Sequence, residues 1–151
     1  MIDDDINIEG LIAAWGPDEV DLSLHVDGVS HWYGEGDTRK QVLFENELRV
    51  RRGEIVIMTG PSGSGKTTLL TLIGTLRSVQ AGSLRVLGTE LNGIGADATN
   101  LLRRKTGFIF QAHNLFESLS AYQNVRMATE LATPDLADTK SHIEGTLTRL
   151  G

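Results

Sequence analysis

Residues 60–68 combine glycines, hydroxyls and one lysine at a spacing that suits a chain of phosphates. Gly60, Gly65, Lys66 and Thr67 fit the pattern G-x-x-x-x-G-K-[ST]. Glycines permit the backbone conformations in which consecutive N–H groups wrap a phosphate, and a helix starting at Lys66 would add about half a positive charge at the same place. Lys66 would reach the β- and γ-phosphates, and Thr67 would bind Mg²⁺. The stretch therefore predicts a P-loop, a nucleotide phosphate site.

The elements on either side of this loop are those that a P-loop requires. The apolar run before it predicts a buried strand over residues 55–59, and the apolar helical stripe after it predicts a helix from Lys66 to about Leu76. The alternative is a Gly/Ser-rich surface turn. The combination of strand, loop and helix disfavours that alternative.

The remaining pattern predicts strands around the loop and helices after it. Alternating apolar and polar residues over 20–26 indicate a half-buried strand of an antiparallel sheet. Ser120-x-x-Gln123 is typical of a capping box for a helix that continues to residue 132. Further expected elements are a strand at 42–50, a turn at 51–54, a strand at 83–87, a helix at 97–105 and an apolar run of strand length at 106–110. A last helix is expected to open at Thr133-Pro134. Its apolar stripe of Leu136, Ile143, Leu147 and Leu150 has no visible partner in the sequence.

Composition limits the function classes. A chain of 151 residues is one average domain or a piece of something larger, and it contains no cysteine, which excludes disulfides and thiolate metal sites. No stretch approaches the ~20 apolar residues of a membrane-spanning helix. Seven of the 20 acidic residues fall in the first 21 residues, which contain no Lys or Arg. The rest is nearly neutral, so no nucleic-acid partner is expected. His25 and His31 are interpreted as ordinary surface histidines, because neither has a partner at metal-ligand spacing.

Two further places carry candidate site residues. Trp32 and Tyr33 end the first strand, and the residues alone leave a nucleobase platform and simple strand-end packing equally open. Gln111 follows the apolar run at 106–110, so its amide oxygen could bind Mg²⁺ or an attacking water at the edge of a sheet. A loop glutamine that bonds its own backbone is the alternative, and spacing alone favours it.

From about residue 20 to residue 151 the chain resembles the ATP-binding subunit of an ABC transporter. Tyr33 is similar to the family's A-loop tyrosine, which stacks on adenine, and Gln111 after Gly-Phe-Ile-Phe is similar to its Q-loop glutamine. Residues 115–125 resemble the segment that meets the membrane subunit. The Walker A motif covers Gly60, Pro61, Ser62, Gly63, Ser64, Gly65, Lys66, Thr67 and Thr68.

Within this family the chain is most similar to the LolD and MacB type, which serves lipoprotein release and macrolide or lipid export, and there to the DevA-type subunits of cyanobacterial glycolipid exporters. The resemblance implies an α/β fold: a P-loop NTPase core with an N-terminal antiparallel β subdomain and the start of a helical subdomain. Residues 1–19 would be an acidic N-terminal extension. Residues 20–151 would be the N-terminal portion of the ATP-binding domain.

The same resemblance implies a mechanism and partners. ATP and Mg²⁺ would be bound, with Lys66 and Gln111 catalytic and with Thr67 and Gln111 at the metal. The expected partners are transmembrane permease subunits and a second ATP-binding subunit, as a homodimer in the complete protein. The expected location is cytoplasmic, peripheral at the inner face of the cell membrane through the permease.

The sequence also departs from the family's pattern. A signature Leu-Ser-Gly-Gly-Gln, a Walker B strand ending in Asp-Glu, a D-loop and a switch histidine are not found. The chain is therefore expected to be a truncated N-terminal portion that lacks ATP turnover by itself. The alternative is a hydrolysis-deficient nucleotide-binding or regulatory module. A GTPase or nucleotide kinase is disfavoured, because neither D-x-x-G nor N-K-x-D occurs.

Overall fold

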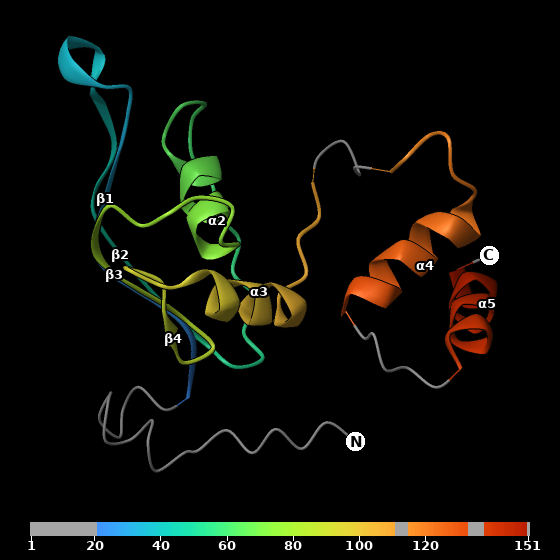
Figure 1. Cartoon of the computed structure of the whole chain (residues 1–151). Helices are drawn as coiled ribbons and strands as arrows, with labels where there is room; N and C mark the ends of the chain where they lie inside the picture. Colours follow the sequence, from blue (N-terminus) through green and yellow to red (C-terminus); the bar gives the residue numbers. More distant parts are fainter. Residues whose placement is uncertain (1–20, 111–114, 133–137, 151) are drawn as a thin grey trace. The chain divides into compact units, whose positions relative to one another are not determined.

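The computed structural model describes residues 21–110, 115–132 and 138–150 (Figure 1). The expected acidic extension at 1–19, Gln111 and the Thr133-Pro134 helix start lie outside the described residues. The chain divides between Thr99 and Asn100 into two compact units.

A four-stranded antiparallel sheet forms the first unit. Its strands are β1 (Leu22–Tyr33), β2 (Lys40–Arg51), β3 (Ala81–Val86) and β4 (Thr89–Glu90), in the spatial order β2-β1-β3-β4 (Figure 1). The short 3₁₀ helix η1 (Gly36–Thr38) lies in the connection between β1 and β2. The predicted antiparallel β subdomain is therefore present, and the predicted turn at 51–54 is confirmed by a hydrogen bond from the Glu54 N–H to the Arg51 carbonyl.

The central strand β1 carries much of the core. Val26 pairs with Leu48 of β2 on one side and with Leu84 of β3 on the other, and the pairing with β3 ends at Ser30 and Ala81. Register shifts interrupt both pairings. Buried apolar side chains from the sheet and its surroundings are Leu22, Val26, Val29, Leu43, Leu69, Leu72, Leu84, Val86 and Leu91.

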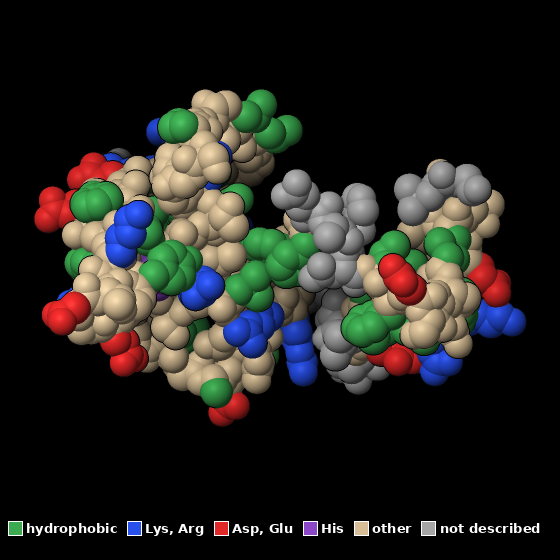
Figure 2. Space-filling view, turned by 90° about the horizontal axis from the view of Figure 1, so that it is seen from above, with side chains coloured by type: hydrophobic (Ala, Val, Ile, Leu, Met, Phe, Trp, Pro, Cys, Tyr) green, Lys and Arg blue, Asp and Glu red, His purple; other side chains and the backbone are tan. Residues whose placement is uncertain are grey.

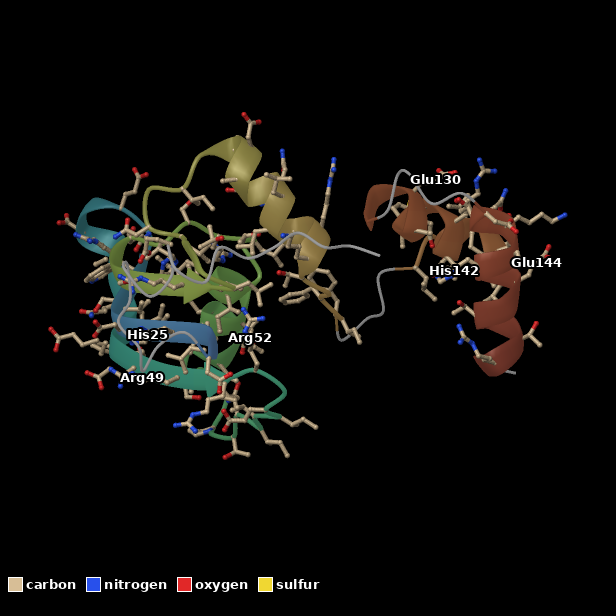
Figure 3. All side chains as sticks on the ribbon, turned by 90° about the horizontal axis from the view of Figure 1, so that it is seen from below. His25, Arg49, Arg52, Glu130, His142 and Glu144 are labelled. Carbon is tan, nitrogen blue, oxygen red and sulfur yellow. The ribbon has the colours of Figure 1, made fainter. Side chains whose placement is uncertain are left out.

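The prediction that His25 and His31 are surface histidines is wrong. Both are buried, and His31 is only 3% exposed. Register shifts in both pairings of β1 break strict alternation, so the expected polar side of this strand does not face solvent along its whole length. The Arg49 Nε–H donates to His25 Nε2 over 3.3 Å, and both residues are labelled on neighbouring strands in Figure 3.

The apolar run before the P-loop does not form the predicted buried strand. Residues 54–60 carry no strand, and Ile55 is 91% exposed. The apolar run at 106–110 likewise lacks strand structure, and Ile109 is 90% exposed. A buried strand needs paired neighbours, and no described strand runs beside either segment. Figure 2 shows that exposed hydrophobic side chains are visible on the surface of the molecule.

Helix α2 (Lys66–Ile73) follows the P-loop and packs against β2 (Figure 1). Its apolar stripe buries Leu69 and Leu72, as the helical periodicity predicts. The helix ends three residues before the predicted Leu76, because Gly74 caps it and Thr75 then adopts a φ of +57°. The chain from Gly74 to Gln80 returns to β3.

The second unit is helical. The division falls within α3 (Ala96–Lys105), and α4 (Ala121–Ala132) packs against α5 (Thr139–Leu150). The predicted capping box is confirmed: the Ser120 N–H donates to Gln123 Oε1 at 2.8 Å, and the Gln123 N–H donates to Ser120 Oγ at 3.2 Å.

The apolar stripe of α5 has a partner in this unit. Ile143 is fully buried and Leu147 is half-buried. The prediction that this stripe has no partner, and so leaves Ile143 exposed, is therefore wrong. Outside this stripe, ion pairs at i and i+4 join Arg126 to Glu130 and Lys140 to Glu144. The two glutamates are labelled in Figure 3. In the part of the chain that the structure describes, no helix is both long and apolar enough to cross a membrane.

Candidate functional site

Three glycines give the P-loop its shape. Gly60, Gly63 and Gly65 have φ values of +148°, +79° and +87°. Gly65 is the N-cap of α2, and a Cβ there would lie 2.9 Å from the Val42 carbonyl oxygen and 2.7 Å from Leu43 Cδ2. Gly65 is thus required both by its backbone conformation and by the closeness of β2. The first N–H groups of α2 have no partners within the helix, so this end favours an anion.

The Lys66 ammonium lies over the loop. Its Nζ donates to the carbonyl oxygens of Gly60 and Pro61, each at 2.7 Å, and to Ser64 Oγ at 3.1 Å. These three contacts hold the charge directly above the turn that the glycines form. An anion bound there would replace or share the hydrogen bonds that the Lys66 ammonium already makes to the loop.

A hollow of about 440 Å³ opens beside the loop. Its lining combines the loop, the first turn of α2 and the ends of two strands. The lining residues are Tyr33, Val42, Ser62, Gly63, Ser64, Gly65, Lys66, Thr67 and Thr68. Most residues proposed from the sequence therefore meet at one place. Gly60 and Pro61 join them through their hydrogen bonds to Lys66.

Tyr33 forms the wall of this hollow that lies on the β1 side, and several groups fix its ring. Its hydroxyl lies 3.1 Å from Thr68 Oγ1, and the His31 ring meets it edge-on with a centroid distance of 5.1 Å. The Arg77 guanidinium lies over the ring at 4.8 Å from its centroid. Trp32 does not line this hollow, and Arg39 lies over its ring at 4.6 Å. Of the two aromatics, Tyr33 is the one beside the P-loop.

The pKa of His31 is lowered. Burial disfavours its charged form, and the nearby positive charge of Arg77 lowers the pKa further. His31 Nδ1 is buried without a hydrogen-bond partner among the described residues. The neutral form of His31 is therefore favoured beside the Tyr33 ring, where the imidazole packs edge-on.

Sequence reasoning missed three residues around Tyr33. Val42 lines the hollow from β2, and Arg77 and Gln80 reach the end of β1 from the connection after α2. None of them belongs to a recognisable local pattern. Gln111, the remaining proposed site residue, lies outside the described residues. Thr67 is exposed at the rim of the hollow, and the described residues contain no cluster of three His, Cys, Asp or Glu that could hold a metal by themselves.

A glycine-rich loop that opens a helix, with a lysine held over it and an aromatic ring nearby, defines a P-loop type of nucleotide site. Residues 43–151 match the ABC transporter family, described as "ABC transporter". The chain belongs to this family.

Curated relatives agree with this assignment. The chain is 41% identical over 129 residues to the macrolide export ATP-binding/permease protein MacB 1 of Aeromonas hydrophila, covering 85% of this chain and 20% of that protein. It is 37% identical over 132 residues to the lipoprotein-releasing system ATP-binding protein LolD of a Shewanella species, covering 87% of this chain and 57% of that protein. The predicted likeness to the LolD and MacB type is confirmed. The narrower likeness to DevA-type subunits stays a prediction.

Solved structures show the same fold. A dimeric ATP-binding cassette in a post-hydrolysis state, bound to ADP and Pi, has a TM-score of 0.75 and 29% identity, covering 84% of this chain and 55% of that one. A dimeric bacterial ABC transporter cassette has a TM-score of 0.76 and 30% identity, with the same coverage. The predicted fold class, a partial α/β ABC ATPase domain, is confirmed.

Proposed function

We propose that this chain binds Mg·ATP as the ATP-binding part of an ABC transporter. The observation that carries the proposal is the hollow beside the P-loop, which is lined by Lys66, the first turn of α2 and the Tyr33 side chain. The phosphates would lie along the loop, with Lys66 on the β- and γ-phosphates and adenine on Tyr33. A family member bound to ADP and Pi supports this placement.

Magnesium fits the site only together with the nucleotide. Mg²⁺ prefers a nearly octahedral set of oxygens and usually keeps several waters alongside phosphate oxygens. Thr67 offers one hydroxyl oxygen at the rim, and no carboxylate is among the residues that line the hollow. The metal would thus be held by Thr67 and phosphate oxygens, with Gln111 as a further proposed ligand and catalytic group.

ATP hydrolysis needs more than this hollow supplies. Phosphoryl transfer requires groups that hold the metal and orient the attacking water, and its catalysis is mainly positioning and electrostatic stabilisation. Among the residues of the first unit that line the hollow there is no carboxylate. We therefore expect the 151-residue chain to bind ATP without steady turnover. The lack of a lining carboxylate also favours the alternative function, a hydrolysis-deficient nucleotide-binding or regulatory module.

The transport role rests on the relatives. A macrolide exporter and a lipoprotein-releasing system contain similar ATP-binding parts. The proposed role is to couple ATP binding and hydrolysis to export of a lipid, lipoprotein or hydrophobic compound. Its partners would be permease subunits and a second ATP-binding subunit, which would keep it at the inner face of the membrane in the cytoplasm. No nucleic-acid partner is proposed. The chain spans between a fifth and about three fifths of these relatives.

Calorimetric titration of Mg·ATP into the Lys66→Ala variant tests the assignment. The variant loses a charge-assisted contact worth roughly 1.5–3 kcal/mol, so ATP affinity should fall about tenfold to a hundredfold. Lys140→Ala is the matched control, since its side chain is exposed on α5 and pairs only with Glu144 among the described contacts. Unchanged affinity in Lys66→Ala would exclude the proposed site.

Phosphate release measured on the same preparations tests the expected lack of turnover. ATP binding without phosphate release in the wild-type chain is the expected result. Steady phosphate release that Lys66→Ala abolishes would contradict the expected lack of turnover. It would mean that the chain supplies a catalytic carboxylate from outside the described lining of the hollow.

A further inference from the structure

Tyr33 is held by groups from α2 and from the segment that follows it. Thr68 in the first turn of α2 contacts the Tyr33 hydroxyl, and Arg77, after the end of α2, lies over the ring. The phosphate loop opens the same helix. The ring beside the hollow is thus fixed by the element that also presents the phosphate-binding N–H groups.

Tyr33 separates two hollows. The first is the P-loop hollow described above, whose lining does not include Arg77. The second, of about 460 Å³, includes Arg77 but none of the P-loop residues. Its lining consists of His31, Trp32, Tyr33, Gly34, Glu35, Leu76, Arg77, Ser78 and Gln80. Tyr33 is the residue that both linings share. The Arg77 guanidinium, which lies over the Tyr33 ring, thus lines the second hollow and not the P-loop hollow.

The backbone before Tyr33 is also fixed from the same connection. The Trp32 N–H donates to Gln80 Oε1 at 2.7 Å, and Gln80 Nε2 donates to the Trp32 carbonyl oxygen at 3.2 Å. The pairing of β1 with β3 stops at Ser30 and Ala81. The Gln80 side chain therefore makes, for Trp32, the pair of hydrogen bonds that a neighbouring strand would otherwise make.

We propose that Arg77 is a positioning residue for the nucleobase. It lies over the Tyr33 ring and lines the second hollow instead of the P-loop hollow, and in the proposed arrangement it holds the ring in place for adenine to stack from the P-loop hollow. Gln80 supports the same arrangement by fixing the strand end. The proposal rests on the proposed function, since it needs a base to enter the P-loop hollow. Its physical basis is preorganisation: a ring that is already held in its binding orientation loses less side-chain freedom when a base stacks on it.

The test compares ATP with inorganic triphosphate in Arg77→Met. Methionine keeps an unbranched apolar stem of similar reach and removes the cation. ATP affinity should fall about twofold to fivefold, the range of an exposed cation–π contact, while triphosphate affinity stays unchanged. Arg77→Lys should restore most of the ATP affinity, because it keeps a cation over the ring. A merely structural role of Arg77 would weaken both ligands together.

Arg39→Met is the matched control. It makes the same substitution at the arginine that lies over Trp32, the neighbouring aromatic. ATP affinity should not change. Loss of ATP affinity in Arg39→Met but not in Arg77→Met would overturn the proposal and assign the base to Trp32.

A spectroscopic readout reports the ring directly. The chain has two tyrosines, so 3-fluorotyrosine labelling gives two ¹⁹F signals, and Tyr122→Phe identifies that of Tyr33. Arg77→Met should move the Tyr33 signal and broaden its response to ATP. If Tyr33→Ala weakens ATP selectively but Arg77→Met changes neither affinity nor signal, this inference fails while the proposed function stands. If Lys66→Ala leaves ATP binding intact, the proposed function itself fails.

Discussion

Replacing Gly65 by alanine tests whether closeness to β2 shapes the P-loop. Gly65 has a φ of +87°, and Gly63 in the same loop has a similar φ of +79°. They differ in their surroundings. A Cβ at Gly65 would press on the Val42 carbonyl oxygen and on Leu43, whereas a Cβ at Gly63 would meet nothing within 4 Å. Gly63→Ala is therefore a matched control for backbone conformation.

The magnitudes separate the two variants. An alanine in the left-handed region costs roughly 1–2 kcal/mol, and both variants carry this cost. Gly65→Ala adds the cost of overpacking, roughly 1–3 kcal/mol, because a β2 carbonyl cannot rotate away as a flexible side chain would. We expect about 2–5 kcal/mol of destabilisation in Gly65→Ala and about 1–2 kcal/mol in Gly63→Ala. Against a total stability of about 5–15 kcal/mol, the first is a large fraction.

Urea unfolding measures the difference. Trp32 fluorescence reports on the sheet when Trp15 is replaced by phenylalanine, since the chain contains two tryptophans. The midpoint should fall clearly further in Gly65→Ala than in Gly63→Ala, with an unchanged slope. Equal shifts in the two variants would refute the argument, because the contact with β2 would then contribute nothing.

Two further predictions concern a buried titration and a helix start. Because burial and Arg77 lower the pKa of His31, the unfolded chain takes up a proton near pH 6.5 while the folded chain does not, so stability should be complete above that pH and fall below it. His31→Phe should remove the part of this loss below about pH 6.5 that comes from His31, measured as urea midpoints at a series of pH values. An unchanged pH dependence of the midpoint would assign the loss to other groups. Ser120→Ala should lose the capping contact to Gln123 and destabilise the start of α4 by about 1 kcal/mol, measured by amide exchange. Ser118→Ala should not, and equal exchange in both variants would contradict the capping role.

What the sequence predicted well depends on local contacts. The capping box at Ser120 and Gln123 is set by residues three positions apart, and the start of α2 is set by the glycines directly before it. That strands occur at 22–26 and 42–50 is also predicted from each segment alone, although the alternation expected of the first did not place all of its polar side in solvent. These elements need no information from distant parts of the chain.

What it missed depends on distant contacts. The apolar residues 55–58 would be buried only if other strands lay beside them. No described strand lies there, and most of the run is exposed. The contact of Arg77 with Tyr33 and that of Gln80 with Trp32 join segments separated by β2, the P-loop and α2. No periodicity within either segment indicates these contacts. The prediction that His31 is a surface histidine failed for the same reason, since its burial depends on contacts from outside its own segment.

The exposed apolar run at 55–57 also bears on how assembly of this protein has to be measured. Ile55, Val56 and Ile57 are exposed, apolar and uncharged, and an exposed apolar patch favours association between molecules. A dimer detected in solution would therefore have two possible origins, this run or the nucleotide site. Only association that ATP increases and Lys66→Ala removes would belong to the nucleotide site. Self-association that persists without ATP and is weakened by Ile57→Lys would belong to the exposed run.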